Sequence, residues 1–558
     1  MIRKLLSDMR SWSFWQWATL GAALLFFVLL VLPLLNLVLA SFRPSSAWGP
    51  GGTSFIGTYV EFFSYRYYYS TLINSFLVST LATLFALLIG FPLAYLVNRI
   101  EFPGKFLVRV AVVLTFVSPP FIGAYAWILL LGRNGFITQL LKSIGVTLPS
   151  IYGWKGIVLV FTLQAFPFVF LLCSSGLRSI DQSLEEAAIN LGRTRLGALW
   201  SVILPLMVPS ITTGALLVFV TTFADFGTPQ IIGEGFRVLA SLIYSEYVNE
   251  FGGNPRVAST LSVMLLAVTI GALLLQRAFA KRYAYGQEAI RPLGVYRLSP
   301  LGTFVAALVV YTIVFAAFLP TLTIIVSSFL KSQGPLLLPE FSLQGYRLAS
   351  RLPLAFRNSL VYVTTATLLC VVVGSLLGYI VSRGRGRLVA AIDTMSMIPF
   401  AVAGVVLGIA LSITYGGPPF YLAGTGALLV LAYFIRRLPY TVRSVSSMLH
   451  QIGVQQEEAS INLGVPPART FLRITVPQVT PALVSGALLT WATTAREFNS
   501  TVMLYVGQTR TLPVEVFTQV LQGNFGAASV VGTVLIVTTL VPILILFKVF
   551  GEDEDVLV

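Results

Sequence analysis

Five charged residues lie inside stretches of the sequence that are otherwise apolar. Arg436 and Arg437 interrupt LAYFIRRLPYTVRS, Arg496 and Glu497 interrupt TWATTAREFNS, and Asp225 lies in TTFADFGTP. If these stretches cross a membrane, the charges are costly, and such charges face a water-filled cavity or pair with one another. The chemistry they offer is electrostatic, because they can bind or repel a charged solute or hold helices together.

Two interpretations of the five charges remain open from the sequence. They form structural ion pairs, for example Arg436 or Arg437 with Asp225 or Glu497, or they line a translocation path or its gate. Two arginines in one stretch would suit an anionic or chelated solute. Adjacent residues on a helix point in different directions, however, so we do not expect Arg436 and Arg437 to point the same way.

The sequence offers little other chemistry. His450 is the single histidine, and Cys173 and Cys370 lie within apolar stretches, so no Cys/His/carboxylate cluster has the spacing of a metal site. The sequence contains no G-x4-G-K-[S/T] phosphate-binding loop and no long polar segment that could form a nucleotide-binding domain. We therefore expect no catalytic residue, no metal ligands and no cofactor bound by this chain.

Composition places most of the chain in lipid. The mean hydropathy is +0.86 and only 10% of the residues are charged, which no soluble protein of 558 residues would show. We expect an all-α integral membrane protein with about 12 transmembrane helices, because a barrel would need short alternating strands. The expected spans are 17–41, 72–98, 108–132, 154–177, 205–227 and 257–277, then 300–329, 357–382, 388–414, 422–445, 477–500 and 526–549.

The loop charges orient these spans. In this topology the side that holds the N-terminus carries 21 of the lysines and arginines and the opposite side carries 12. Positive charge stays cytoplasmic, so we expect a multi-pass protein with both termini in the cytoplasm. The net charge of +15 then follows from topology and attraction to anionic membrane lipid, and it indicates no nucleic-acid partner.

The chain contains one segment twice. Residues 185–211 read EEAAINLGRTRLGALWSVILPLMVPSI and residues 457–483 read EEASINLGVPPARTFLRITVPQVTPAL, 272 positions later. Earlier pairs, such as Arg99 with Arg383, are 284 positions apart, so twelve residues are missing from the second copy, and the outer loop 133–153 is where we expect the difference. Six spans return the chain to its starting side, which predicts two parallel six-helix repeats, residues 1–285 and 286–558.

Each copy is expected to form a helix, a tight turn and a second helix. Asp181 or Ser183 can cap the first helix, and acidic residues in its first turn are favoured by the helix dipole. Gly192 allows a reversal with positive φ, a second helix follows at about 194–203, and Pro205 is expected to open the next span. We call residues 181–204 the first loop and residues 453–476 the second loop.

The pattern E-A-A/S-x3-G-x9-hydrophobic-x-hydrophobic-P resembles the coupling loop of ATP-binding-cassette (ABC) importer permeases. Its presence in both loops, together with ADFGTP, IRRLPYTVRS and AREF, is most similar to the fused permeases of ferric-iron importers, which implies a type I importer-like permease. The resemblance implies that these loops contact an ATPase, with Glu186 and Glu458 making polar contacts and Gly192 and Gly464 permitting the turn. The ATPase-coupling residues it implies are Glu185, Glu186, Ala187, Gly192, Glu457, Glu458, Ala459 and Gly464.

The same resemblance implies the partners and the location. Two copies of a cytoplasmic ATPase would use ATP and magnesium, and a periplasmic or lipid-anchored binding protein would deliver the solute across a bacterial inner membrane. This chain itself is then not an enzyme. Ferric iron is the solute expected first, and phosphonate, thiamine or polyamine are alternatives with the same machinery.

Two other classes of protein share some of these sequence features. An ion-coupled secondary transporter could share the span count and the parallel repeat, but it would need no repeated loop and would carry ion sites in broken helices. A membrane-embedded enzyme would need a convergent nucleophile, base or metal site, and the sequence shows none.

Overall fold

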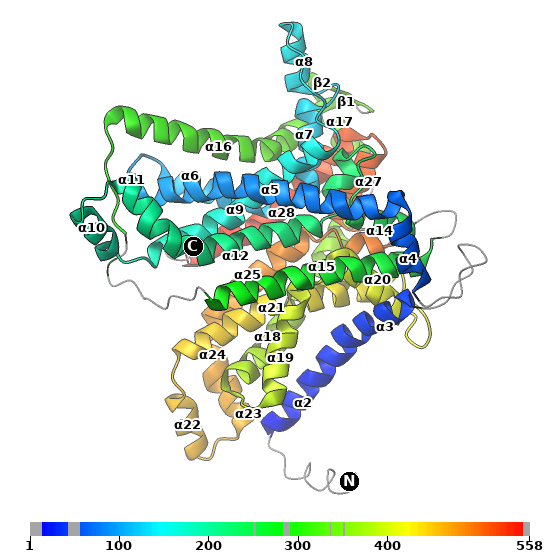
Figure 1. The fold of residues 1–558 in the computed structure, drawn as a ribbon. Helices are drawn as coiled ribbons and strands as arrows, with labels where there is room; N and C mark the ends of the chain where they lie inside the picture. Colours follow the sequence, from blue (N-terminus) through cyan, green and yellow to red (C-terminus); the bar gives the residue numbers. More distant parts are fainter. Residues whose placement is uncertain are drawn as a thin grey trace.

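The computed structural model describes residues 14–42, 56–248, 253–282, 291, 293–334, 336–349 and 352–550. This part of the chain is helical apart from one small antiparallel hairpin, β1 (Leu330–Gln333) and β2 (Leu336–Phe341), and one isolated bridge, as the apolar composition predicts (Figure 1). The expected boundary between the repeats, at 285/286, lies outside the described residues.

The spans of the first repeat form in the expected order, with short helices between them. The long elements are α2 (Phe14–Phe26), continued through the π-helical η1 (Phe27–Val31) into α3 (Leu32–Ser41); α5 (Arg66–Arg99); α6 (Lys105–Val117) with α7 (Pro120–Leu131); α9 (Trp154–Arg178); α12 (Leu204–Phe223); and α15 (Pro255–Arg282). The shorter ones are α4 (Gly57–Ser64), α8 (Phe136–Ser143), α10 (Gln182–Asn190), α11 (Arg195–Ala198), η2 (Leu199–Ile203), α13 (Gly227–Ile232) and α14 (Leu239–Tyr247).

The second repeat follows the same order. Its long elements are α16 (Pro300–Ser327), α18 (Leu352–Arg383), α19 (Arg387–Ala401) with α20 (Gly404–Tyr415), α21 (Gly426–Gln451), α25 (Thr480–Ala495) and α28 (Phe525–Phe550). The shorter ones are α17 (Gln344–Leu348), α22 (Gln455–Asn462), α23 (Pro467–Thr470), η3 (Phe471–Thr475), α24 (Val476–Gln478), α26 (Thr501–Leu504) and α27 (Leu512–Leu521).

Among the described residues, nine helices are long and apolar enough to cross a membrane, or eleven if each bent pair is one span. The span that completes the expected twelve is α21, which is 26 residues long. Every stretch of 18 residues within α21 contains Arg436, Arg437 and Arg443, so it is too charged to be recognised by composition alone. Its buried residues lie against neighbouring helices, which protects it from lipid.

The duplication in the sequence is also a duplication in packing. Helices α5, α9 and α12 pack against one another in the first repeat, and α18, α21 and α25 do so in the second. The connection from α7 to α9 covers residues 132–153 and includes α8, whereas the matching connection from α20 to α21 covers only residues 416–425. The twelve-residue difference is therefore where the change of offset predicts it, and the extra residues include α8, which projects from the body (Figure 1).

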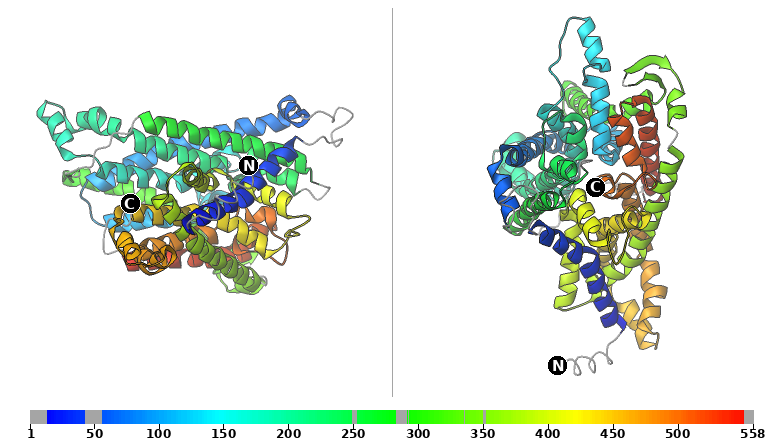
Figure 2. Two further views of the ribbon diagram at one scale, coloured as in Figure 1. Left: turned by 90° about the horizontal axis from the view of Figure 1, so that it is seen from below. Right: turned by 90° about the vertical axis from the view of Figure 1, so that its right-hand side faces the viewer.

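The first span of each repeat packs against the other repeat. Helix α3 contacts α20, and α2 contacts α19 and α18, while α16 of the second repeat contacts α6, α7 and α5. The blue N-terminal helix and the yellow segments accordingly lie together in both views of Figure 2. The tyrosine hydroxyl of Tyr415 donates to the carbonyl of Val28 at 2.5 Å, and Asn36 donates to Thr414 at 3.1 Å. This exchange ties the repeats together beyond their central interface.

Three prolines inside the spans follow π-helical turns. A proline cannot donate to the carbonyl four residues back and its ring collides with that group, and a local widening of the helix relieves this clash. The segments η1, η2 and η3 each end two residues before a proline, namely Pro33, Pro205 and Pro477. Pro205 therefore does not open a span, as the sequence suggested, but lies inside a continuous helix that begins at Arg195.

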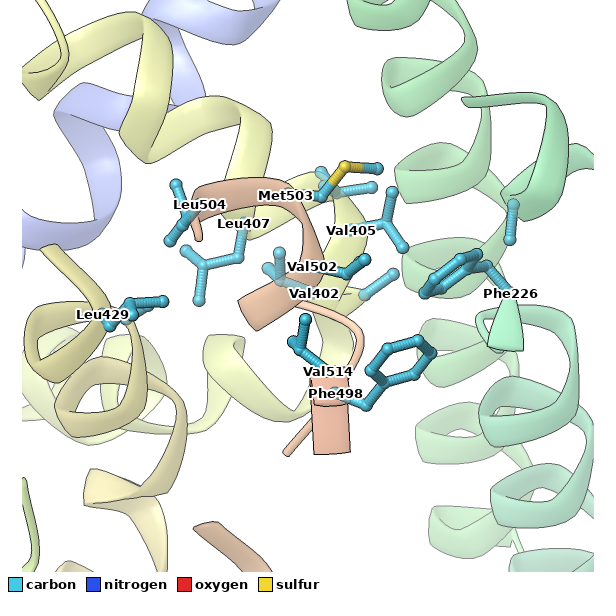
Figure 3. Packing of buried hydrophobic residues seen from close by; sticks show 14 of the residues in the cluster. Phe226, Val402, Val405, Leu407, Leu429, Phe498, Val502, Met503, Leu504 and Val514 are labelled. Carbon is cyan, nitrogen blue, oxygen red and sulfur yellow. The ribbon is translucent and has the colours of Figure 1, made fainter. Parts of the chain in front are cut away.

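One span of each repeat is broken at the equivalent place. Helix α6 ends at Val117 and α7 begins at Pro120, while α19 and α20 form an angle of 111° around Val402 and Ala403. The second half of each broken span is surrounded by core: Val402, Val405 and Leu407 pack with Val502 and Met503 of α26, and Phe226 from the first repeat faces this cluster (Figure 3). The breaks therefore place helix N-termini inside the protein.

Candidate functional site

Each repeated loop reverses at its glycine. Helix α10 ends before Gly192, whose φ is +88°, and α22 ends before Gly464, whose φ is +82°. These positive values were predicted from the sequence, and Asp181 caps α10 by accepting from the amide of Ser183 at 2.9 Å. A Cβ at either glycine would meet nothing within 4 Å, so the backbone conformation alone makes a larger residue unfavourable there.

In the first loop, Glu185 is buried and bound to the end of α5. Its side chain forms an ion pair with Arg99, and both side chains are at most 5% exposed. The hydroxyl of Tyr296 donates to the other carboxylate oxygen of Glu185 at 3.0 Å. Burial raises the pKa of Tyr296, so this tyrosine stays protonated and remains a donor. Removing one partner of such a pair costs roughly 3–5 kcal/mol, so the pair fixes α10 to α5.

The second loop repeats this arrangement with its own residues. Glu457 pairs with Arg383 at 3.3 Å and accepts from the hydroxyl of Tyr379 at 2.9 Å. Tyr379 is the repeat of Tyr95, whose hydroxyl instead lies 3.0 Å from that of Tyr296. An arginine at the end of the second span therefore holds the buried glutamate in both repeats. The tyrosine that joins it comes from the second span in the second repeat, but from the segment between the repeats in the first. The duplicated arginine was visible in the sequence, but its contact with the loop was not.

Described residues of the segment between the repeats form a strap along the first loop. The carbonyl of Arg291 accepts from the amide of Gln182 at 2.9 Å, and the amide of Arg291 donates to Asp181 at 3.0 Å. The amide of Tyr296 donates to the carbonyl of Arg99 at 2.8 Å. Beside the second loop, the ring of Trp15 in α2 stacks on Tyr379 in α18, with ring centroids 4.2 Å apart.

We expect Tyr296→Phe to loosen the first loop and leave the second unchanged. The variant removes the hydrogen bonds between the Tyr296 hydroxyl and the buried Glu185 and Arg99, and one such bond to a charged group is worth about 1.5–3 kcal/mol. Hydrogen exchange in residues 182–190 should rise by at least about tenfold, while residues 455–462 keep their rate. Tyr379→Phe is the matched variant and should show the opposite pattern. Equal exchange in both segments of both variants would contradict the assigned contacts.

The face of each loop turned away from the protein is exposed and partly apolar. Leu191 is 86% exposed and Leu463 is 84% exposed, at equivalent positions beside the two turns. The same position therefore carries a large, exposed apolar residue in both repeats. Some of the residues expected to contact an ATPase are exposed, namely Glu186, Ala187 and Gly192 in the first loop and Glu458, Ala459 and Gly464 in the second. Glu185 and Glu457 are buried, so they can act on a partner only by positioning this face.

A cavity of about 240 Å³ lies between the repeats at the two breaks. All five intramembrane charges identified from the sequence line it, so the fold brings them together although they lie up to 272 positions apart. The main lining residues besides these charges are Ser118, Phe121, Gln164, Thr221, Thr222, Ala403, Tyr440, Phe498 and Asn499.

Both neighbouring arginines reach the same carboxylate, contrary to the expectation that they would not point the same way. The Nε atom of Arg436 lies 3.1 Å from Glu497, and Arg437 pairs with the same carboxylate oxygen. Glu497 also accepts from the amide of Ser500 at 3.2 Å and from its hydroxyl at 3.0 Å. Long arginine side chains converge even when their Cα–Cβ bonds diverge, so the direction at the backbone does not decide their partners.

Asp225 repeats the capping role of Glu497 without the arginines. Its carboxylate accepts from the amide of Thr228 at 3.1 Å, as Glu497 does from the equivalent Ser500, and from Asn499 of the other repeat at 3.3 Å. Gln164 and Ala165 stand in the first repeat where the second has Arg436 and Arg437. The two walls of the cavity are therefore alike in fold and unlike in charge.

Comparison with known families identifies the type of protein. A family model described as "Binding-protein-dependent transport system inner membrane component" matches residues 86–285 and 370–551. The chain belongs to this family. The two matched stretches show that the permease carries two family domains, and its many apolar helices agree with a multi-pass inner-membrane protein.

The permease is similar to curated transport proteins over different lengths. The ferric transport system permease protein FbpB of Actinobacillus pleuropneumoniae is 27% identical over 96% of this chain and 78% of its own length. Fe(3+)-transport system permease protein FbpB 2 of Haemophilus influenzae is 26% identical over 85% of this chain and 89% of its own length. The molybdenum transport system permease protein ModB of Escherichia coli is 32% identical over 37% of this chain and 90% of its own length.

An aromatic cluster of the permease lies beside the cavity, and the sequence did not predict it. Phe226 and Phe498, which follow the two carboxylates at equivalent positions, stack with ring centroids 5.0 Å apart (Figure 3). The ring centroid of Phe498 also lies 4.4 Å from that of Phe121 and 4.9 Å from that of Phe517. Because Tyr244 of α14 stacks on Phe226, the cluster joins the broken spans to the segments that follow α12 and α25. The one signal available was that a phenylalanine follows both carboxylates.

Proposed function

We propose that the permease imports ferric iron from the periplasm to the cytoplasm, driven by two copies of a separate ATPase subunit. The observation that carries the importer mechanism is the pair of equivalent loops, each with a buried glutamate anchor and an exposed face bearing a leucine. The proposal of ferric iron rests on relatives named as ferric transport permeases that align with most of the chain. A periplasmic or lipid-anchored binding protein would supply the solute.

Each loop would seat in a groove of one ATPase subunit. Leu191 and Leu463 provide apolar contact area, and Glu186 and Glu458 provide polar contacts next to them. Because the buried anchors tie α10 to α5 and α22 to α18, movement of the ATPases would be passed to the long helices rather than absorbed in the loops. Trp15, near the first described residue, packs on Tyr379 at the second loop, which supports an N-terminus on the cytoplasmic side with both loops.

The cavity would be the translocation path, with Asp225, Arg436, Arg437, Arg496 and Glu497 on its walls. The stack of Phe226 on Phe498 joins the repeats directly beside it and would act as a gate. Opening would separate the two rings and break the hydrogen bond from Asn499 to Asp225. Alternating access then becomes a shift between two states of one interface.

The test of this function is reconstitution of the permease with its ATPase and binding protein in lipid nanodiscs. We expect a stable complex whose ATPase activity rises with ferric-loaded binding protein and not with the empty form. The double variant Leu191→Asp with Leu463→Asp should lower ATPase association by at least about tenfold, because each places a charge in an apolar contact. Leu140→Asp, on the projecting α8, is the control. Unchanged association in the loop variant would contradict the docking role.

A response of the complex to a different solute would keep the mechanism and change the cargo. Molybdate is the second candidate, since ModB aligns over nearly its whole length. Phosphonate or thiamine would be tested next. Polyamines are disfavoured by the three arginines on the cavity wall, because they are themselves cationic.

A further inference from the structure

We propose that the cavity binds a compact oxyanion, either free or as part of the ligand shell of a metal, and does not coordinate a bare metal cation. This inference rests on the proposed role of the cavity as the translocation path and names the class of solute that fits it. It follows from the balance of donors and acceptors on the walls, from the helix ends that face the cavity and from the difference between the repeats.

The charged groups on the wall leave a positive excess. Arg436, Arg437 and Arg496 face two carboxylates, so the formal charge of the lining is +1. Within the described residues, Nη1 of Arg436 is buried and has no hydrogen-bond partner. A buried cationic donor without an acceptor is costly, and an oxyanion is the ligand whose oxygens a guanidinium binds best.

The carboxylates are already occupied by donors from the protein. Glu497 binds two arginines and Ser500, and Asp225 binds the amide of Thr228 and the side chain of Asn499. Fe³⁺ and other hard cations need several oxygen ligands that are free to coordinate. Across the described ranges, no group of three or more His, Cys, Asp or Glu residues could hold a metal ion. A cation would therefore have to displace arginines from Glu497.

The broken spans add positive potential at the same place. Helices α7 and α20 begin at Pro120 and Gly404, and Pro120 and the residues just before Gly404 line the cavity. Helix N-termini carry partial positive charge, and half-helices of transporters use it to hold anionic groups. Arg436 lies directly against the start of α20, where a Cβ on Gly404 would be 2.5 Å from Nη1. The arginine and the helix end thus act on one site.

The arginines of the site all come from the second repeat. Gln164 replaces Arg436 on the opposite wall, and its amide nitrogen donates to the carbonyl of Pro120 at 2.9 Å. Its amide oxygen is buried and, among the described residues, unpartnered, so it can accept from a protonated oxyanion or from the water around it. One oxyanion, with the second repeat as its charged wall, fits a single cavity of about 240 Å³.

Equilibrium binding to the permease–ATPase complex in nanodiscs tests this assignment. The probes are radiolabelled phosphate and molybdate for a free oxyanion, ferric citrate for an oxyanion chelate, and aquated Ga³⁺ and Mg²⁺ for bare cations. We expect saturable binding of at least one oxyanion probe and none of the cations. Arg436→Gln, which copies Gln164 at the equivalent position of the first repeat, should weaken that binding by at least about tenfold.

Two further variants keep the result interpretable. Arg436→Lys keeps the charge opposite Glu497 and should fold, yet it loses the planar donors and should also bind more weakly. Arg443→Gln changes an arginine on the same helix that pairs with Asp393 outside the cavity at 2.8 Å, and it should bind as the unaltered permease does. Unchanged binding in both Arg436 variants would mark an adventitious ion only and overturn the proposal.

The remaining outcomes separate this inference from the proposed function. Binding of Ga³⁺ or Mg²⁺ without any oxyanion, or no binding of any probe to an intact complex, would overturn the oxyanion site while the importer mechanism stands. Failure of the ATPase to associate would overturn the mechanism, whatever the cavity binds. Competition between phosphate or molybdate and ferric citrate for the same site would show whether the free oxyanion or the chelate binds more tightly.

Discussion

Replacing Gly192 or Gly464 with valine is expected to abolish transport while the permease remains folded in the membrane. Both glycines have φ above +80°, and a β-branched residue there costs of the order of 1–3 kcal/mol and favours a different turn. A different turn would move Leu191 or Leu463 away from an ATPase groove. Solute uptake by proteoliposomes that contain the complete complex would measure the loss.

Gly145→Val is the matched control for these two variants. Gly145 has a φ of +81° and open space around it, so the local strain is the same, but it lies in the connection that contains α8. We expect near-normal uptake from this variant. Transport at the original rate in both loop variants would contradict the coupling assignment, whereas loss in all three would point to strain alone.

The second large effect is expected from Glu497→Ala. The substitution leaves Arg436 and Arg437 without their shared carboxylate in a buried site, and such a change costs roughly 3–5 kcal/mol. We expect a clear drop in the thermal unfolding midpoint of the purified permease in detergent. Uptake should fall as well, because the freed arginines would hold the anionic solute or block its path.

Asp225→Ala tests the same position in the other repeat. Asp225 is bound by an amide and an asparagine rather than by arginines, so its removal should cost only about 1–3 kcal/mol. The prediction that discriminates best is that Glu497→Ala destabilises the permease more than Asp225→Ala does. An equal or larger effect of Asp225→Ala would mean that the arginines draw their stability from other contacts.

Much of the fold followed from patterns that depend on neighbours in the chain. Long apolar stretches predicted the spans, and paired motifs predicted the two repeats and even the connection that differs by twelve residues. Such features are local or repeat at a fixed offset, so no knowledge of packing was needed. The prediction failed for Pro205 because a π-helical turn can absorb a proline, and this choice is not visible in the residue types.

The site was predictable as a set of residues and not as an arrangement. The sequence singled out Arg436, Arg437 and Glu497 as unusual, but it left open whether they pair or line a path. The structure shows that they pair and that the ion pairs lie on the wall of a cavity, and we propose that this cavity is the path. The length of the arginine side chain decides which carboxylate it can contact. The directions of neighbouring Cα–Cβ bonds therefore do not predict the partners of an arginine.

The sequence by itself determined the membrane class, the doubled repeat and the two loops with their glycine turns, because hydropathy and motif spacing are properties of the chain. Tertiary structure alone decided which glutamate of each loop is buried, how Tyr296 and Trp15 reinforce different loops, and that the first spans exchange between repeats. It also decided that the three arginines gather on the cavity wall formed by the second repeat, whereas the first repeat contributes Asp225. These features depend on contacts between residues tens to hundreds of positions apart, which pack together only when the helices assemble.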